Sequence, residues 1–226
     1  RYLDVSDANA TLTSGGVTVV NGANGTGNTN ITFYSATEST VSYRDGVDSY
    51  AGTEDTYISA SAPTTAYGSS NIIGLDGDPD QAGLIRWDLS AIPANAVVDS
   101  VSLTFNIINE SDVSFEVYEA LQVWTESATW NTYDGATSWS TAGAGAVGTD
   151  YDDTDLGSIY LGTNVTGTTT VSLDTNGVAV VQDWITGSTT NNGFLLFDYA
   201  EGTNGMNLAA ANNPTVIYRP RIEIVY

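Results

Sequence analysis

The sequence places three carboxylates at alternate positions of one short turn. Asp76, Asp78 and Asp80 are separated by a glycine and a proline. Calcium takes about six to eight oxygen ligands and is bound by flexible loops that supply several carboxylates. Unpaired carboxylates at this spacing repel one another, and a divalent ion would relieve that repulsion. The turn therefore predicts a calcium site, with a solvated acidic loop as the alternative.

A second group of carboxylates suggests the same chemistry later in the chain. It consists of Asp150, Asp152, Asp153 and Asp155. Four acids within six positions again present several hard oxygen atoms, which are the ligands that calcium prefers. We therefore expect calcium as the cofactor, at either acidic segment.

Carboxylates could also catalyse glycoside hydrolysis. Glu126 lies between Trp124 and Trp130, and a glycosidase would need a second carboxylate roughly 5–10 Å away. Acidic residues are so numerous that several could fill this role, among them Glu54, Asp55 and Asp88. A structural interpretation competes, in which Glu126 accepts hydrogen bonds from the backbone or from an arginine.

Other catalytic side chains are missing from the chain. It contains no histidine, no cysteine and no lysine. A serine–histidine triad therefore cannot form, and neither can a zinc site that takes histidine and cysteine ligands. We expect a protein that is not an enzyme.

The charge balance excludes several partners. The formal net charge is −22, with 27 acidic residues against five basic ones. Nucleic acids and anionic membranes would be repelled, and the chain has no apolar run of the length that spans a bilayer. Only 14% of the residues are charged, so Thr, Ser, Asn and Gly supply most of the polarity. This composition is typical of secreted or cell-surface β proteins.

The aromatic residues offer a candidate sugar-binding platform. Trp139 and Tyr133 lie in a segment rich in Gly, Thr and Ser, where we expect them to be exposed. Trp87 and Trp184 lie in apolar runs and are expected in the core. Arg86 stands between Ile85 and Trp87, and we expect it to pair with a carboxylate, because an unpaired buried arginine is very costly.

Alternating apolar residues predict strands along most of the chain. The pattern is regular over residues 101–107, 113–117 and 222–226, and 194–197 is a continuous apolar run. Period-two runs bounded by Gly, Asn and Pro clusters favour an antiparallel β-sandwich. One short helix is expected over residues 178–185, ended by Gly187. We predict an all-β chain in which residues 41–226 form a sandwich of jelly-roll type.

Residues 1–40 are predicted to form a separate extension. Short strand-like segments are joined there by a Gly/Asn/Thr-rich linker over residues 21–30. The extension could add strands to its own sandwich, or it could donate a strand to a neighbouring copy. In the second case the buried side chains would be Leu3, Val5, Ala8, Ala10 and Leu12. A head-to-tail contact of this kind propagates into a filament if the rotation does not close.

Five Asn-X-Ser/Thr sequons could accept glycans in a secreted protein. They begin at Asn9, Asn24, Asn30, Asn109 and Asn164.

From about residue 43 to residue 226 the chain resembles the DNRLRE domain family of secreted β modules. Short segments carry the resemblance, in order. They are Arg44-Asp45-Gly46-Val47, Asp55-Thr56-Tyr57-Ile58, Tyr67-Gly68-Ser69-Ser70, Leu84-Ile85-Arg86-Trp87-Asp88-Leu89-Ser90, Ile92-Pro93, Val123-Trp124-Thr125-Glu126-Ser127, Thr129-Trp130-Asn131, Val180-Val181-Gln182-Asp183-Trp184, Asn192-Gly193-Phe194-Leu195-Leu196 and Arg219-Pro220-Arg221-Ile222. Each segment is weak alone, and together they are fairly specific.

The resemblance implies a jelly-roll sandwich without catalytic chemistry. Relatives occur in cell-surface proteins, in adhesive repeats and as carbohydrate-binding modules beside polysaccharide-degrading enzymes. Two functions follow as expectations. The first is a secreted structural subunit that assembles with itself into a filament or surface layer through its N-terminal extension. The alternative is a carbohydrate-binding or adhesive module for a neutral polysaccharide.

Overall fold

The computed structural model describes residues 3–5, 17–20, 22–24, 31–34, 38–199 and 204–226. The chain divides into two compact units, Arg1–Ser39 and Thr40–Tyr226. Among the described residues, no helix has both the length and the apolar character needed to cross a membrane.

The described residues of the first unit form the short strands β1 (Leu3–Val5), β2 (Val17–Val20), β3 (Gly22–Asn24) and β4 (Ile31–Tyr34). They form two parallel pairs, β1 with β3 and β2 with β4. Leu3 and Val5 therefore lie in a strand, whereas Ala8, Ala10 and Leu12 lie outside the described residues. Pairing of this segment with another copy stays a prediction.

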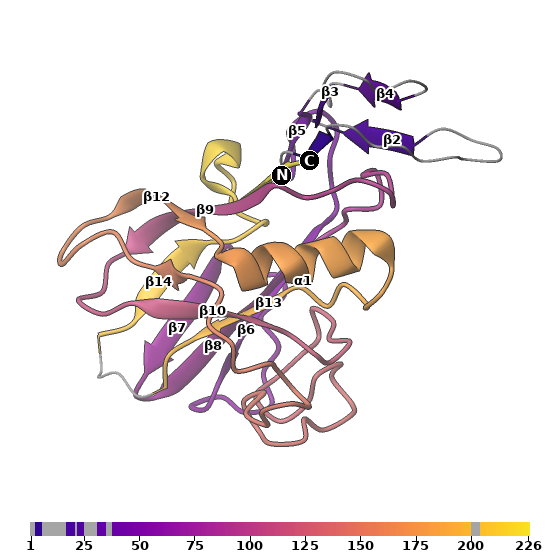
Figure 1. The fold of residues 1–226 in the computed structure, drawn as a ribbon. Coiled ribbons are helices and arrows are strands. Elements are labelled where there is room, and N and C mark those ends of the chain that lie inside the picture. The colour runs from indigo at the N-terminus through magenta and orange to yellow at the C-terminus, as the bar shows by residue number, and fades with distance from the viewer. Residues whose placement is uncertain (1–2, 6–16, 21, 25–30, 35–37, 200–203) are drawn as a thin grey trace. The chain divides into compact units, whose positions relative to one another are not determined.

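The second unit is an antiparallel β-sandwich, as predicted (Figure 1). The strands of its first layer are β5 (Thr40–Tyr43), β9 (Ser100–Asn109), β12 (Gly167–Ser172), β14 (Met206–Ala209) and β15 (Arg221–Val225). The strands of its second layer are β6 (Thr53–Ser59), β8 (Asp80–Trp87), β10 (Phe115–Glu119), β11 (Ser158–Ile159) and β13 (Phe194–Phe197). Strand β7 (Ile72–Gly77) pairs with β14 and then with β8, so it joins the two layers.

A large apolar core fills the space between the layers. Leu103 and Phe105 of β9 belong to it together with Ile85 and Trp87 of β8. Alternation accounts for this arrangement, because every second side chain of a strand points to the same face.

Helix α1 (Thr175–Thr186) adds Val181, Trp184 and Ile185 to this core. It begins three residues before the predicted start. The Asp174 side chain caps it by accepting hydrogen bonds from the N–H groups of Asn176 and Gly177, at 2.9 and 2.8 Å. Gly187 ends the helix with a φ of 75°, a conformation that glycine adopts without strain. A short 3₁₀ helix, η1 (Val216–Tyr218), precedes β15.

A second, smaller core covers the outer face of the second layer. Leu84 of β8 and Leu195 of β13 pack there against Trp124, Ala128 and Trp139. These last three residues belong to the long connection between β10 and β11. The connection is therefore a packed part of the fold, and strand β8 is buried on both of its faces.

Asp55 is an acid buried inside the second unit, at 1% exposure. Its carboxylate accepts a hydrogen bond from the N–H of Ala211 at 2.5 Å. Burial, which disfavours the charged form, raises the pKa of Asp55 from 3.8 to about 7, and the negative charges of Glu126 and Asp45 add to the effect.

The raised pKa makes a prediction about stability and pH. The folded state holds a proton on Asp55 between about pH 4 and pH 7, where the unfolded state has lost it, so the contribution of Asp55 to stability falls as pH rises through this window. Asp55→Asn cannot ionise, and its side-chain oxygen still accepts from Ala211. We expect this variant to be more stable than the wild type at pH 8, by roughly 2–4 kcal/mol, and similar to it at pH 4.

Denaturant unfolding across this pH range measures the difference. Asp88→Asn is the matched control, because hydrogen bonds from Ser90 lower the pKa of Asp88, so its removal should have the opposite sign. A constant difference between Asp55→Asn and wild type at all pH values would contradict the assignment.

Candidate functional site

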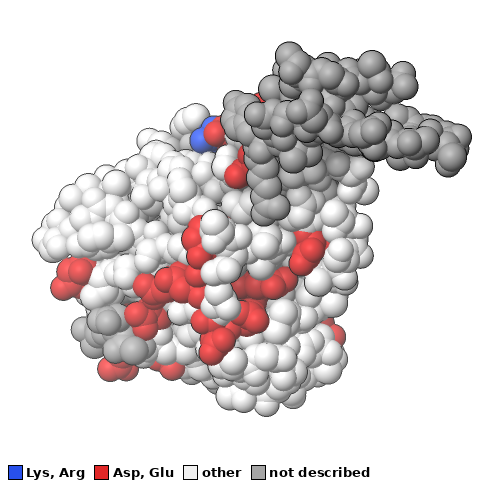
Figure 2. Space-filling view, in the orientation of Figure 1, with Lys and Arg blue, Asp and Glu red and all other residues white. Residues whose placement is uncertain are grey.

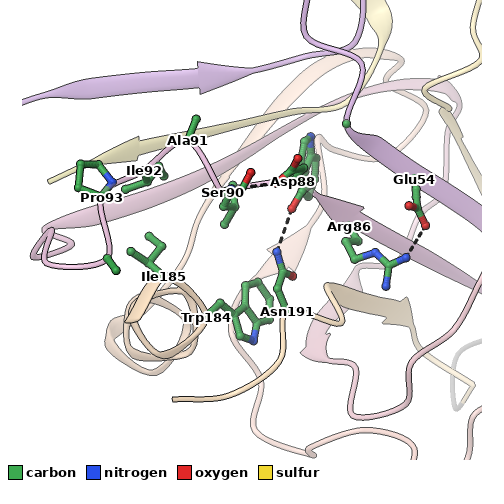
Figure 3. Close-up of a pocket in the computed structure, with 14 residues that line it drawn as sticks. Glu54, Arg86, Asp88, Ser90, Ala91, Ile92, Pro93, Trp184, Ile185 and Asn191 are labelled. Carbon is green, nitrogen blue, oxygen red and sulfur yellow. Dashed lines mark hydrogen bonds and ion pairs between the residues drawn. The ribbon is translucent and has the colours of Figure 1, made fainter. Parts of the chain in front are cut away.

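A cleft of about 610 Å³ lies between the end of β8 and the C-terminal part of α1 (Figure 3). Arg86, Trp87 and Asp88 line it from the strand, and Trp184 and Ile185 line it from the helix. Leu89 to Ala94, which follow β8, form one wall, and Gly52, Glu54 and Asn191 complete the lining. The cleft thus combines an apolar wall with a few polar side chains, which is the usual composition of a ligand site.

The wall that follows β8 is held by local hydrogen bonds and by buried anchors. The Asp88 carboxylate accepts from the N–H of Ser90 at 2.9 Å, and the carbonyl of Leu89 accepts from the N–H of Ile92 at 2.9 Å. Leu89 and Ile92 are buried in the core. The exposed Ser90 and Pro93 are therefore fixed at the edge of the cleft without a strand to hold them.

Asn191 ties the opposite wall to the end of β8. Its side-chain amide donates to the carbonyl of Trp87 at 2.9 Å, and its side-chain oxygen accepts from the N–H of Gly193 at 3.0 Å. Gly193 has a φ of 73°, and a Cβ at this position would lie 2.2 Å from the carbonyl oxygen of Ile85. Only glycine permits so close an approach. Asn191 and Gly193 together therefore close this side of the site.

Arg86 is the cation of the cleft, and it is fixed on two sides. Its guanidinium forms an ion pair with Glu54 on the neighbouring strand β6. The guanidinium carbon also lies 5.0 Å from the ring centroid of Trp124, a cation–π arrangement. Trp124 is held in turn, because its indole N–H donates to the carbonyl of Asn192 at 2.6 Å. The prediction that Arg86 pairs with a carboxylate is confirmed.

Glu126 has the structural role that was one of its two predicted interpretations. Its carboxylate lies near the backbone N–H of Asp55, which favours the charged form. Partial burial raises the pKa of Glu126, and the charges of Glu54 and Asp45 raise it further, while the Asp55 N–H and the positive Arg86 oppose the shift. Gly68 packs directly on this residue, since a Cβ there would lie 2.3 Å from the Glu126 carbonyl oxygen.

The predicted sugar platform of Trp139 and Tyr133 is wrong in its main residue. Trp139 is only 5% exposed and belongs to the smaller core, where its indole N–H donates to the carbonyl of Thr129 at 2.9 Å. Tyr133 is half-buried and packs edge-on against Trp139. The polar composition of this segment suggested exposure, but the segment folds back onto the sheet. Trp87 and Trp184 are buried as predicted.

Asp150 is a structural anchor, which corrects its assignment as a calcium ligand. It is 1% exposed, and its two carboxylate oxygens accept from the N–H groups of Ser140, Thr141 and Ala146, each at 3.0 Å. The neighbouring acids do not share this role. Asp152 and Asp155 each accept from the N–H two residues later, and Asp153 is exposed.

The first acidic segment forms the hairpin between β7 and β8. Gly77 is paired with Asp80 across the turn, and Asp76 with Gln81. Partial burial and the charges of Asp78 and Asp76 raise the pKa of Asp80, so the three acids repel one another. Within the described part of the chain, however, no three acidic side chains form a group that could hold a metal ion. Calcium at this hairpin stays a prediction.

Two of the predicted glycan acceptors, Asn109 and Asn164, are exposed. Asn24 ends β3, and Asn9 and Asn30 lie outside the described residues.

Substitutions in the two acidic segments should respond differently to calcium. Asp150→Asn should cost roughly 2–3 kcal/mol of unfolding free energy, because an amide offers one acceptor oxygen and leaves a buried N–H unpaired. The loss should be equal in calcium and in chelator. Asp153→Asn, which is exposed, should change stability little. If calcium binds at the hairpin, it should raise the melting temperature of wild type, and replacing Asp76, Asp78 and Asp80 together should abolish that rise.

A calcium-dependent cost of Asp150→Asn would contradict the anchor. Identical melting of wild type with and without calcium would exclude the hairpin site.

Sequence reasoning did not find the cleft as a site. Arg86, Trp87 and Asp88 were noted as part of a family-like segment, and Trp184 as a core residue. The sequence does not reveal that α1 brings Trp184 beside the end of β8. The only available signal was the clustering of polar residues directly after an apolar strand.

Comparison with known protein families identifies a match for this chain. The model of carbohydrate-binding module family 96 matches residues 47–193, a span that includes every residue lining the cleft. It also includes most of the segments on which the DNRLRE resemblance rested, although the match does not show that family itself. A search of curated proteins found no match. The chain belongs to carbohydrate-binding module family 96.

Proposed function

We propose that the chain is a secreted, non-catalytic module that binds a neutral polysaccharide in the cleft beside Arg86. The observation that supports this most directly is the cleft itself, an apolar wall with the Arg86–Glu54 ion pair inside the family match. The comparison favours this function over a self-assembling filament subunit.

The charges in the cleft favour a ligand without charge. Arg86 is neutralised by Glu54, and Asp88 adds a further exposed carboxylate. An acidic sugar would meet more negative than positive charge there. Sugar hydroxyls, in contrast, can donate to carboxylates and accept from a guanidinium, and hydrogen bonds to charged groups are stronger than those between neutral groups.

The exposed apolar surface of the cleft comes from Ala91, Pro93 and Ala94, which are available to contact the face of a sugar ring, and buried side chains lie behind it. Trp184 and Ile185 lie on one side, and Ile92 and Pro93 on the other (Figure 3). The Trp184 indole is fixed, because its N–H donates to Glu119 at 3.0 Å. A fixed ring loses little conformational entropy when a ligand binds, which lowers the cost of binding.

The proposal predicts that the ion pair is needed for binding. We expect wild type to bind at least one of cellohexaose, mannohexaose, xylohexaose and laminarihexaose in isothermal titration. Arg86→Gln and Glu54→Gln should each weaken that binding by about tenfold or more, since each removes charged hydrogen-bond partners of the sugar. Asp153→Asn removes the same charge as Glu54→Gln outside the cleft and should leave affinity unchanged.

No new reducing ends should appear from any of these sugars, because no catalytic group is proposed. Absence of binding to all four sugars, or equal affinity of wild type and both cleft variants, would contradict the proposal.

A further inference from the structure

Two arginines, Arg44 and Arg221, lie close together where the pairing of β5 and β15 ends, close enough for the charge of one to act on the other. Strand β15 pairs with β5 in a register that sets Ile222 opposite Tyr43. Ile222 belongs to the inner core, so Arg221, the first residue of β15, points to the outer face. Arg44 directly follows Tyr43, the last residue of β5, and a continuation of the register would set it opposite Arg221. Directly opposed side chains have Cβ atoms about 4.5–5.5 Å apart, and like charges at such positions destabilise the pair.

The two guanidinium groups are unequally compensated. Arg221 forms an ion pair with Glu223 at 3.1 Å and donates to the Thr104 hydroxyl at 3.2 Å. For the Arg44 side chain the structure gives no acceptor among the residues it describes. The Nε atoms of both arginines are buried and have no hydrogen-bond partner there. The pair therefore holds an excess of one positive charge and at least two unused donors.

This excess stands out in a chain of net charge −22. Acidic side chains form a broad band across the face shown in Figure 2, where basic side chains occupy one small area. Three of the five arginines nevertheless lie close to this strand pair. The third, Arg219, is occupied, since it donates to the carbonyls of Asn213 and Asp45. The carboxylate of Asp45, the acid next in sequence to Arg44, accepts from the N–H of Thr53.

Burial and the charge of Arg221 together lower the pKa of Arg44. The direction agrees with the geometry, because it reports a cation that is partly dehydrated and repelled by its neighbour. A bound anion would oppose this shift, because its negative charge stabilises the charged form of Arg44.

We propose that Arg44 and Arg221 form a binding site for a sulfate group, of the kind carried as a monoester by sulfated polysaccharides. A sulfate monoester carries one negative charge, which matches the excess of one positive charge at the pair. Its three terminal oxygens are arranged around a tetrahedral centre and can accept from two guanidinium groups that approach from adjacent strands. A planar carboxylate has two oxygens and is satisfied by the fork of a single arginine.

The overall negative charge does not prevent such binding at physiological salt. Exposed charges separated by more than about 8 Å are then largely screened, so the nearest side chains dominate. Guanidinium is also weakly hydrated, which reduces the cost of replacing its water by an anion. The site is separate from the cleft and would bind sulfate whether or not the cleft binds a neutral sugar.

Titration with sodium sulfate, at constant ionic strength maintained with sodium chloride, tests the site. The Nε–H signals of the arginines can be followed by nuclear magnetic resonance. We expect those of Arg44 and Arg221 to shift and saturate, while that of Arg86 stays unchanged. In Arg44→Gln the affinity reported by Arg221 should fall by about tenfold or more. Glucose 6-sulfate should reproduce the wild-type result, and glucose should not.

Stability gives an independent measurement. Without sulfate, Arg44→Gln should be at least as stable as wild type, because the substitution removes a like-charge contact. With sulfate, wild type should gain melting temperature by mass action and Arg44→Gln should not. Arg86→Gln is the matched control and should gain as much as wild type.

Two results would overturn the proposal. One is a shift that does not saturate or that chloride reproduces, and the other is tighter binding of sodium glucuronate than of glucose 6-sulfate. Neither result involves the neutral hexasaccharides, so failure of this site and failure of the proposed function can be told apart.

Discussion

Strand β8 is buried on both faces, and the location of the cleft depends on this constraint. Ile85 and Trp87 point into the core between the layers, while Leu84 and Arg86 point to the opposite face, which the connection between β10 and β11 covers in part. A charged residue in such a strand requires a partner, because an unpaired charge shielded from water is very costly. Glu54 and the ring of Trp124 meet this requirement for Arg86. The same contacts present the guanidinium at the mouth of the cleft.

Basic residues are scarce, and each of the four arginines that the structure describes has a recognisable role. Arg86 and Arg221 each have a carboxylate partner, and Arg219 donates to backbone carbonyls. Arg44 has no such partner among the described residues. Arg86, whose charge Glu54 balances, suits a ligand that offers hydroxyl groups, whereas Arg44 and Arg221 share a single carboxylate and so suit an anion. The two proposed sites therefore follow from one comparison of how the cations are compensated.

Sequence patterns predicted the sandwich well, because alternation along a strand is a local property. Residues 101–107 lie in β9 and residues 222–225 in β15. Ile222 and Ile224 point into the core as expected, as do the alternating apolar side chains of β9, and Tyr226, just beyond β15, packs against it. The connection between β10 and β11 was beyond this reasoning. Its Gly, Ser and Thr residues suggested an exposed loop, whereas Trp139 is buried and Asp150 accepts three N–H groups. Such contacts join residues far from any strand period, so nothing in the local pattern reports them. The cleft was missed for the same reason, since Arg86 and Trp184 are brought together by the tertiary fold.

The indole N–H signals of the five tryptophans give the most direct test of where a polysaccharide binds. Trp87 and Trp184 line the cleft, whereas Trp139 lies in the smaller core. With whichever neutral hexasaccharide binds wild type, we expect the Trp184 and Trp87 signals to shift together along one saturation curve, and the Trp139 signal to stay in place. A shift of Trp139 while Trp184 stays unchanged would contradict the cleft as the binding site.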